Sequence, residues 1–209
     1  MTISMPVEPA ANELLSSDPL ALLIGMLLDQ QVPLERAFSA PYDLYRRLGH
    51  RPTADELAGY DPEALAAVFA ERPALHRYPK SMAARVQALA QLLVARYEGD
   101  AGRVWGDAPD GADLLKRVAE LPGFGAQKAQ IFVALLGKRL GVQPAGWREA
   151  AAPFGAEGSY LSVADISDEE SLGRVRAYKQ ELKAAAKAKA AATTKPTTKP
   201  TTKAATKSR

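Results

Sequence analysis

Apolar residues recur every three or four positions through most of this chain, and that helical period is the strongest limit on its fold. The clearest case is the segment of residues 80–98. Its periodic apolar residues are Met82, Val86, Leu89, Leu93 and Tyr97. No segment alternates apolar and polar residues as a half-buried strand would. The sequence therefore predicts an all-α protein of roughly eight to ten helices.

Two helix starts are marked by an aspartate followed by a proline, at Asp18 and Asp61. An aspartate accepts hydrogen bonds from the free amides of a first helical turn, and proline tolerates the first helical position. The first of these helices is predicted to run to about Gln31. It is apolar on all sides, which indicates a central place in the core. Ser167 and Glu170 match the pattern of a capping box before the last helix.

The composition excludes several kinds of site. With 47% hydrophobic residues, the chain can bury one sizeable core or two small lobes. Because it has no cysteine, it carries no disulfide, no thiolate nucleophile and no cysteine-ligated zinc or iron–sulfur cluster. With only two histidines, no metal site and no cofactor are expected.

The apolar segments do not suggest a membrane protein. The longest apolar run, residues 20–28, is too short to cross a bilayer. The N-terminal segment has no basic stretch and carries glutamates, so it does not match a signal peptide. We expect a soluble, cytoplasmic protein with no membrane partner.

Residues 183–209 differ in composition from the rest of the chain. They hold eight Lys or Arg and no acid, so 19 of the 27 basic residues remain in the body, against 24 acidic residues. The TTKP repeats bury no apolar area, and the chain after about Ala192 is predicted to be disordered. Such a tail is either a solubilising appendage or a nonspecific contact for nucleic-acid phosphates, and we favour the second.

The sequence LPGFG joins two short amphipathic runs in the second half of the chain. Gly123 and Gly125 allow positive φ, and because they have no side chain they leave the backbone accessible to a ligand. The second run begins at Ala126, where the first amides of a helix lack acceptors of their own. Lys128 adds a cation nearby, and Phe124 can anchor the turn in the core. This pattern is typical of a phosphate site, whereas the simpler interpretation makes Gly125 only a helix cap.

The segment LPGFGAQKA resembles the hairpin of the helix-hairpin-helix (HhH-GPD) DNA glycosylase superfamily, in which Leu-Pro-Gly precedes an apolar residue and a second glycine. The segment DPLALLIGMLLDQQ resembles an early helix of that superfamily, which ends in a Ser-Gln-Gln-like turn facing the DNA. The two segments lie about ninety residues apart, as in the family. The resemblance covers residues 15–182 and implies a two-lobed helical fold of the HhH-GPD type.

The resemblance implies a protein that excises or recognises damaged bases in double-stranded DNA, and that is nucleoid-associated when bound. Hairpin amides would hold the phosphate backbone, a glutamine turn would support or fill the opened duplex, and the target base would flip into a cleft between the lobes. In the simpler interpretation the two glutamines are only a surface helix end. The predicted DNA-binding residues are Gly123, Phe124, Gly125, Ala126, Gln127, Lys128, Gln30 and Gln31.

The catalytic positions of the family are not matched. Gln127 stands where bifunctional members have a lysine, and residues 143–145 stand where the family has its essential aspartate. That carboxylate stabilises an oxocarbenium-like sugar or activates water. Glu149, the nearest acid, is either a replacement or a solvated helix residue beside Arg148, and we favour the second. Trp147 either stacks on a base or, as is more usual, lies buried.

Three functions are compatible with these observations. The first is a base-excision-repair protein of this superfamily, with catalysis left open; the second is a non-catalytic module that recognises damaged or distorted DNA. The third and weakest is a helical protein-interaction domain. The predicted division is an N-terminal extension (1–14), an HhH-GPD-like domain (15–182, hairpin at about 112–137) and a basic tail (183–209) that ends the last helix and is then disordered.

Overall fold

A computed structural model describes residues 2–193, and within that range it contains helices and no strand. The helices are α1 (Pro9–Ser17), α2 (Pro19–Leu28), α3 (Leu34–Leu48), α4 (Ala54–Gly59), α5 (Pro62–Ala70), α6 (Pro79–Tyr97), α7 (Arg103–Gly106), α8 (Gly111–Ala119), α9 (Ala126–Leu135), α10 (Trp147–Ala150) and α11 (Glu169–Thr193). A π-helical turn, η1 (Leu136–Leu140), extends α9, and a 3-10 turn, η2 (Val163–Asp165), precedes α11.

The all-α prediction is confirmed for the described residues. Their eleven α-helices exceed the expected eight to ten, because α7 and α10 have four residues each and are too short to give a periodic pattern. The disorder predicted after about Ala192 lies almost wholly outside the described residues, since α11 ends at Thr193.

Helix α2 lies at the centre of the molecule, as its all-apolar sequence predicts. Every residue in the range 20–28 is buried. The Asp18 carboxylate starts the helix by accepting a hydrogen bond from the Ala21 amide at 3.1 Å, and Asp61 caps α5 in the same way. Helix α2 ends three residues before the predicted end, because Asp29 has φ −70° and ψ 70°, outside the helical region.

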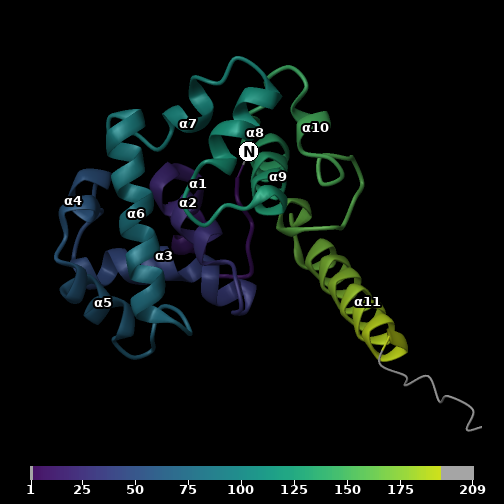
Figure 1. Cartoon of the computed structure of the whole chain (residues 1–209), viewed down its shortest axis with the longest axis horizontal. Coiled ribbons are helices and arrows are strands. Elements are labelled where there is room, and N and C mark those ends of the chain that lie inside the picture. The colour runs from purple at the N-terminus through teal and green to yellow at the C-terminus, as the bar shows by residue number, and fades with distance from the viewer. Residues whose placement is uncertain (1, 194–209) are drawn as a thin grey trace, which may run out of the picture.

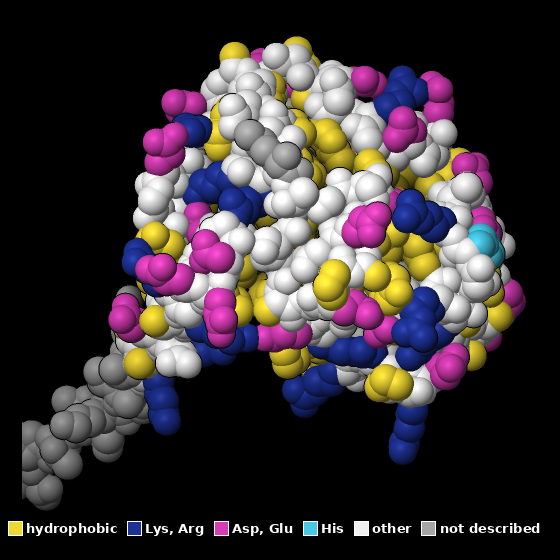
Figure 2. Space-filling model, turned by 180° about the vertical axis from the view of Figure 1, so that it is seen from behind, with side chains coloured by type: hydrophobic (Ala, Val, Ile, Leu, Met, Phe, Trp, Pro, Cys, Tyr) yellow, Lys and Arg dark blue, Asp and Glu magenta, His cyan; other side chains and the backbone are white. Residues whose placement is uncertain are grey.

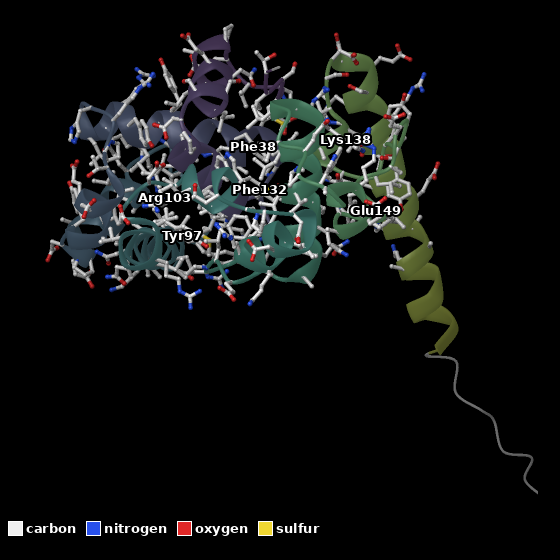
Figure 3. The ribbon with its side chains drawn as sticks, turned by 90° about the horizontal axis from the view of Figure 1, so that it is seen from above. Phe38, Tyr97, Arg103, Phe132, Lys138 and Glu149 are labelled. Carbon is white, nitrogen blue, oxygen red and sulfur yellow. The ribbon has the colours of Figure 1, made fainter. Side chains whose placement is uncertain are left out.

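The helices form two groups around one continuous apolar core (Figure 1). In the first group, α6 packs against α4 and α5, and α2 packs against α1 and α3. In the second group, α8 packs against α9 and α10. Phe38 of α3 and Phe132 of α9 are fully buried, one in each group (Figure 3). The predicted two-lobed arrangement is therefore confirmed, with the hairpin helices in the second group.

Helix α11 is capped by a different pair from the one predicted. The Asp168 carboxylate accepts a hydrogen bond from the Ser171 amide at 2.8 Å, while the Ser171 hydroxyl accepts bonds from the Ser167 and Asp168 amides at 2.9 and 3.0 Å. The capping box assigned to Ser167 and Glu170 is therefore wrong by one position, because the sequence SDEES offers a cap in either register. From this start α11 extends away from the two helix groups (Figure 1).

The N-terminal segment packs against the first helix group. Ile3 and Met5 are buried, and the Ile3 amide donates a hydrogen bond to Ser16 Oγ at 2.9 Å. The backbone amide and carbonyl of Met5 pair with the Asn12 side chain at 2.8 and 2.9 Å. The predicted boundary after residue 14 thus falls inside α1.

No single helix within residues 2–193 has both the length and the apolar composition of a membrane span. Helices α1 and α2 meet that criterion only as a pair, with a bend of 113° between them. The described side chains also include no group of three or more His, Cys, Asp or Glu placed to bind a metal ion.

Candidate functional site

The LPGFG segment forms a tight turn between α8 and α9. Gly123 is exposed and has φ of 85°, in the left-handed region that glycine adopts without strain. Phe124 is only 4% exposed, and its ring meets the Phe132 ring edge-on with the centroids 5.6 Å apart. The prediction that Phe124 anchors the turn in the core is confirmed.

Gly125 has φ −76° and ψ 170°. The prediction of positive φ therefore holds for Gly123 and is wrong for Gly125. The physical reason is that Gly125 is the N-cap of α9, a position that takes extended backbone angles. A β-carbon built on Gly125 would meet no atom within 4 Å. The missing side chain thus leaves the surface beside the first turn of α9 open.

The amides that follow this turn lack acceptors. The Phe124 amide donates to the Leu121 carbonyl at 3.0 Å, and the Ala129 amide donates to the Gly125 carbonyl at 2.9 Å. Between them, the amides of residues 125–128 have no backbone or capping acceptor among the described residues. Such N–H groups bind anions, because the helix dipole adds partial positive charge at the same end.

Lys128 connects the hairpin to the end of α2. Its ammonium donates hydrogen bonds to the carbonyl oxygens of Met26 and Leu27 at 2.8 and 3.0 Å. Burial lowers the pKa of Lys128, and the nearby charge of Asp29 partly opposes that shift. The side chain therefore fixes the position of α9 relative to α2, while its direct contact with DNA stays a prediction.

The glutamine turn, Gln30 and Gln31, is separated from α2 by Asp29 alone and is held by the first helix group. The Gln30 side chain donates to the Leu27 carbonyl at 2.8 Å and accepts from Arg85 Nη1 at 2.9 Å. His76 Nδ1 accepts a hydrogen bond from the Tyr78 amide. The proton of the ring is therefore on Nε2, which donates a hydrogen bond to the Gln30 carbonyl at 2.9 Å. No sequence pattern identified Arg85 or His76 as supports of this turn.

Gln31 is exposed and has φ of 56°. A residue other than glycine in the left-handed region costs about 1–3 kcal/mol, and such residues concentrate at functional sites. The preceding residue, Gln30, is held by hydrogen bonds to Leu27, His76 and Arg85. Gln31 follows this hydrogen-bonded residue and is predicted to meet the opened duplex.

A hollow of about 670 Å³ lies between the first turn of α9 and α11. Gln127 and Asp29 contribute polar side chains to it, and Lys179 lies on its α11 side. Phe154 and Tyr178 are its aromatic lining residues. This volume is within the range of small-molecule sites, which usually combine apolar walls with a few polar groups. Asp29 is not among the site residues predicted from the sequence, although it directly precedes the two glutamines.

The segment expected to hold the family's aspartate lies at the other end of α9. Gln143 Nε2 donates to the Gly137 carbonyl at 2.9 Å, and the Ala145 carbonyl accepts from the Gly111 amide at 2.7 Å. Gly111 begins α8 and Gly137 follows α9, so both contacts are remote from the LPGFG turn between these helices. Since α9 alone spans roughly 15 Å at 1.5 Å per residue, this segment is about one helix length from the free amides.

Trp147 and Glu149 of α10 lie at the same remote end. The indole is 6% exposed and packs so closely on Gly137 that a β-carbon there would lie 2.3 Å from the ring. The buried alternative for Trp147 is confirmed. Glu149 is exposed and does not line the hollow beside Gln127; Figure 3 shows it with Lys138 on the α11 side of the molecule. This position favours Glu149 as a solvated helix residue.

The face shown in Figure 2 has Lys and Arg side chains interspersed with Asp and Glu. That mixture agrees with the excess of acidic residues outside the tail. On such a surface, local amides rather than a broad cationic face would hold a phosphate.

Comparison with protein families identifies one model that matches this chain. The model of the HhH-GPD superfamily base excision DNA repair protein matches residues 24–196, which include the glutamine turn, both hairpin helices and the described length of α11. No curated protein and no solved structure matches the chain. Because the match spans most of the sequence and agrees with the hairpin geometry, the chain belongs to the HhH-GPD superfamily of base excision DNA repair proteins.

Proposed function

We propose that this protein is a base-excision-repair protein that binds damaged double-stranded DNA by its hairpin and receives one flipped base in the hollow beside Gln127. The observation that carries the proposal is the group of acceptor-free amides at residues 125–128, held next to the glutamine turn by Lys128. One side of the molecule thereby offers a phosphate site, a strained glutamine and a hollow. In base flipping the target nucleotide leaves the stack and enters a pocket, and a nearby phosphate contact and a side chain beside the opened duplex would support that step.

The phosphate contact is tested by filling the space beside the amides. In Gly125→Val the backbone keeps its favourable extended angles, but the new side chain occupies the surface where a phosphate would approach. Loss of one charge-assisted contact costs about 1.5–3 kcal/mol, or roughly 10- to 150-fold in Kd. Fluorescence anisotropy with a duplex containing an abasic analogue, at one fixed salt concentration, measures this change.

Gly173→Val is the matched control. Gly173 is exposed on α11, and a β-carbon there also meets no atom within 4 Å. We expect this control to bind DNA like the wild type. Equal affinities of the wild type and Gly125→Val for the duplex would show that the hairpin does not contact DNA phosphate.

A second function, recognition of damaged DNA without excision, is favoured by two observations. Gln127 occupies the place of the family's lysine, and the neutral residues 143–145 are turned toward the remote end of α9. Release of free bases from duplexes carrying alkylated, oxidised or deaminated bases separates the two functions. Binding without release by the wild type would support recognition alone.

A further inference from the structure

Asp29 is an acidic residue that lines the hollow beside the first turn of α9. It follows α2 directly, precedes the glutamine turn, and lines the same hollow as Gln127 of the first turn of α9. It also lines a second hollow, between the start of α3 and α11. The side chain is therefore placed where the end of α2, the hairpin helix and α11 meet.

The environment of Asp29 is unusual for an acid. The carboxylate is partly withdrawn from water, and burial raises its pKa. Lys179 and Lys128 oppose that shift through their charge, yet neither forms an ion pair with Asp29 within the side chains described by the structure. A carboxylate that is partly removed from water and has no ion-pair partner lowers the stability of the fold. A carboxylate in such an environment is a candidate for a functional role.

The other acids near the hollow are already engaged. The Asp165 carboxylate is 3% exposed, pairs with Lys138 at 2.5 Å and accepts hydrogen bonds from the amides of Leu161 and Ser162 at 2.9 and 3.1 Å. Asp168 caps α11. Each of these carboxylates would have to lose the hydrogen bonds or the ion pair just described before it could contact a substrate.

We propose that Asp29 supplies the negative charge for base removal and thus takes the role that no residue after the hairpin fills. This inference rests on the proposed function, because it places the flipped nucleotide in the hollow that Asp29 and Gln127 share. Asp29 acts on the sugar end of that nucleotide, and the aromatic lining residues Phe154 and Tyr178 contact the base.

The reaction is a hydrolysis of the bond between sugar C1′ and the base nitrogen. As that bond breaks, its electron pair leaves with the base, which takes up a proton from solvent. The Asp29 carboxylate stabilises the positive charge that develops on the sugar and accepts one proton from a water molecule. The water oxygen adds to C1′, giving a free base and an abasic sugar. Gln127 has no amine, so no covalent imine forms at that position and the DNA strand is not cut.

The test uses a cationic sugar analogue, which resembles the positive charge that develops on the sugar. Two short duplexes differ only at one abasic position: one has a pyrrolidine, which is positively charged, and the other a neutral tetrahydrofuran. The full chain, Asp29→Asn and the control Glu149→Gln are compared by fluorescence anisotropy. We expect the wild type and Glu149→Gln to prefer the pyrrolidine duplex by about tenfold or more. Asp29→Asn should bind both duplexes as the wild type binds tetrahydrofuran.

The outcomes separate this inference from the function on which it rests. No preference in the wild type, or a preference that survives Asp29→Asn, would overturn the role of Asp29 while DNA binding stands. If neither duplex binds any of the three proteins, the proposed function itself fails. Far-ultraviolet circular dichroism of Asp29→Asn checks that its helices are intact, because asparagine keeps the size of the side chain.

Discussion

The two hairpin glycines have different backbone angles, so they should respond differently to the same kind of substitution. Gly123 has φ of 85°, and alanine in the left-handed region costs about 1–2 kcal/mol. Its β-carbon would lie 3.4 Å from Leu27 Cγ, an ordinary contact that adds little. Gly125 has extended angles and open space, and serine at an N-cap is at least as favourable as glycine.

For a chain of this size, 1 kcal/mol shifts the Tm by roughly 2–4 °C. We therefore expect Gly123→Ala to lower the Tm by about 2–8 °C, and Gly125→Ser to leave it within about 2 °C of the wild type. Thermal unfolding followed by circular dichroism measures both values. Equal losses of stability in the two variants would show that the backbone angle does not determine the cost of the substitution.

Two further predictions concern charge. Since the folded pKa of Asp29 is raised, the folded state binds its proton more tightly than the unfolded state, and stability falls as pH rises through and above about 4. Asp29→Asn should therefore have a higher Tm than the wild type at pH 7, and the difference should vanish below about pH 4; a constant difference across that range would contradict the shift. Truncation after Thr193 removes five Lys or Arg, so the slope of log Kd against log salt for duplex DNA should fall by up to about 4.5 while the Tm stays unchanged, and an identical slope would exclude the tail from DNA contact.

The features predicted correctly from the sequence are those that depend on neighbouring residues. Asp18 and Asp61 cap helices because their carboxylates reach amides three residues ahead. The period of residues 80–98 predicted a buried face, and its periodic apolar residues are buried in α6: Met82, Val86, Leu89, Leu93 and Tyr97. The role of Phe124 followed from an apolar residue between two glycines in a turn.

The features that the sequence did not reveal depend on packing between distant segments. The loop before α10 stays at the remote end of α9 because Trp147 packs against Gly137 and the Ala145 carbonyl binds the Gly111 amide. The exposure of Asp29 to the hollow depends on where α9 and α11 lie relative to α2. Such packing leaves no local sequence pattern. A carboxylate near the hairpin amides therefore could not be identified from residue spacing after the hairpin.

The proposed function depends on main-chain amides of the hairpin that hold a DNA phosphate. The most direct measurement is a titration of the ¹⁵N-labelled protein with a short duplex containing one tetrahydrofuran abasic site, followed by amide chemical shifts. We expect the largest shifts on residues 125–128, with a second set at Gln31, and we expect residues 125–128 to move downfield as their N–H groups gain an anionic acceptor. Shifts confined to the basic tail, with the hairpin amides unchanged at saturation, would contradict the proposed function.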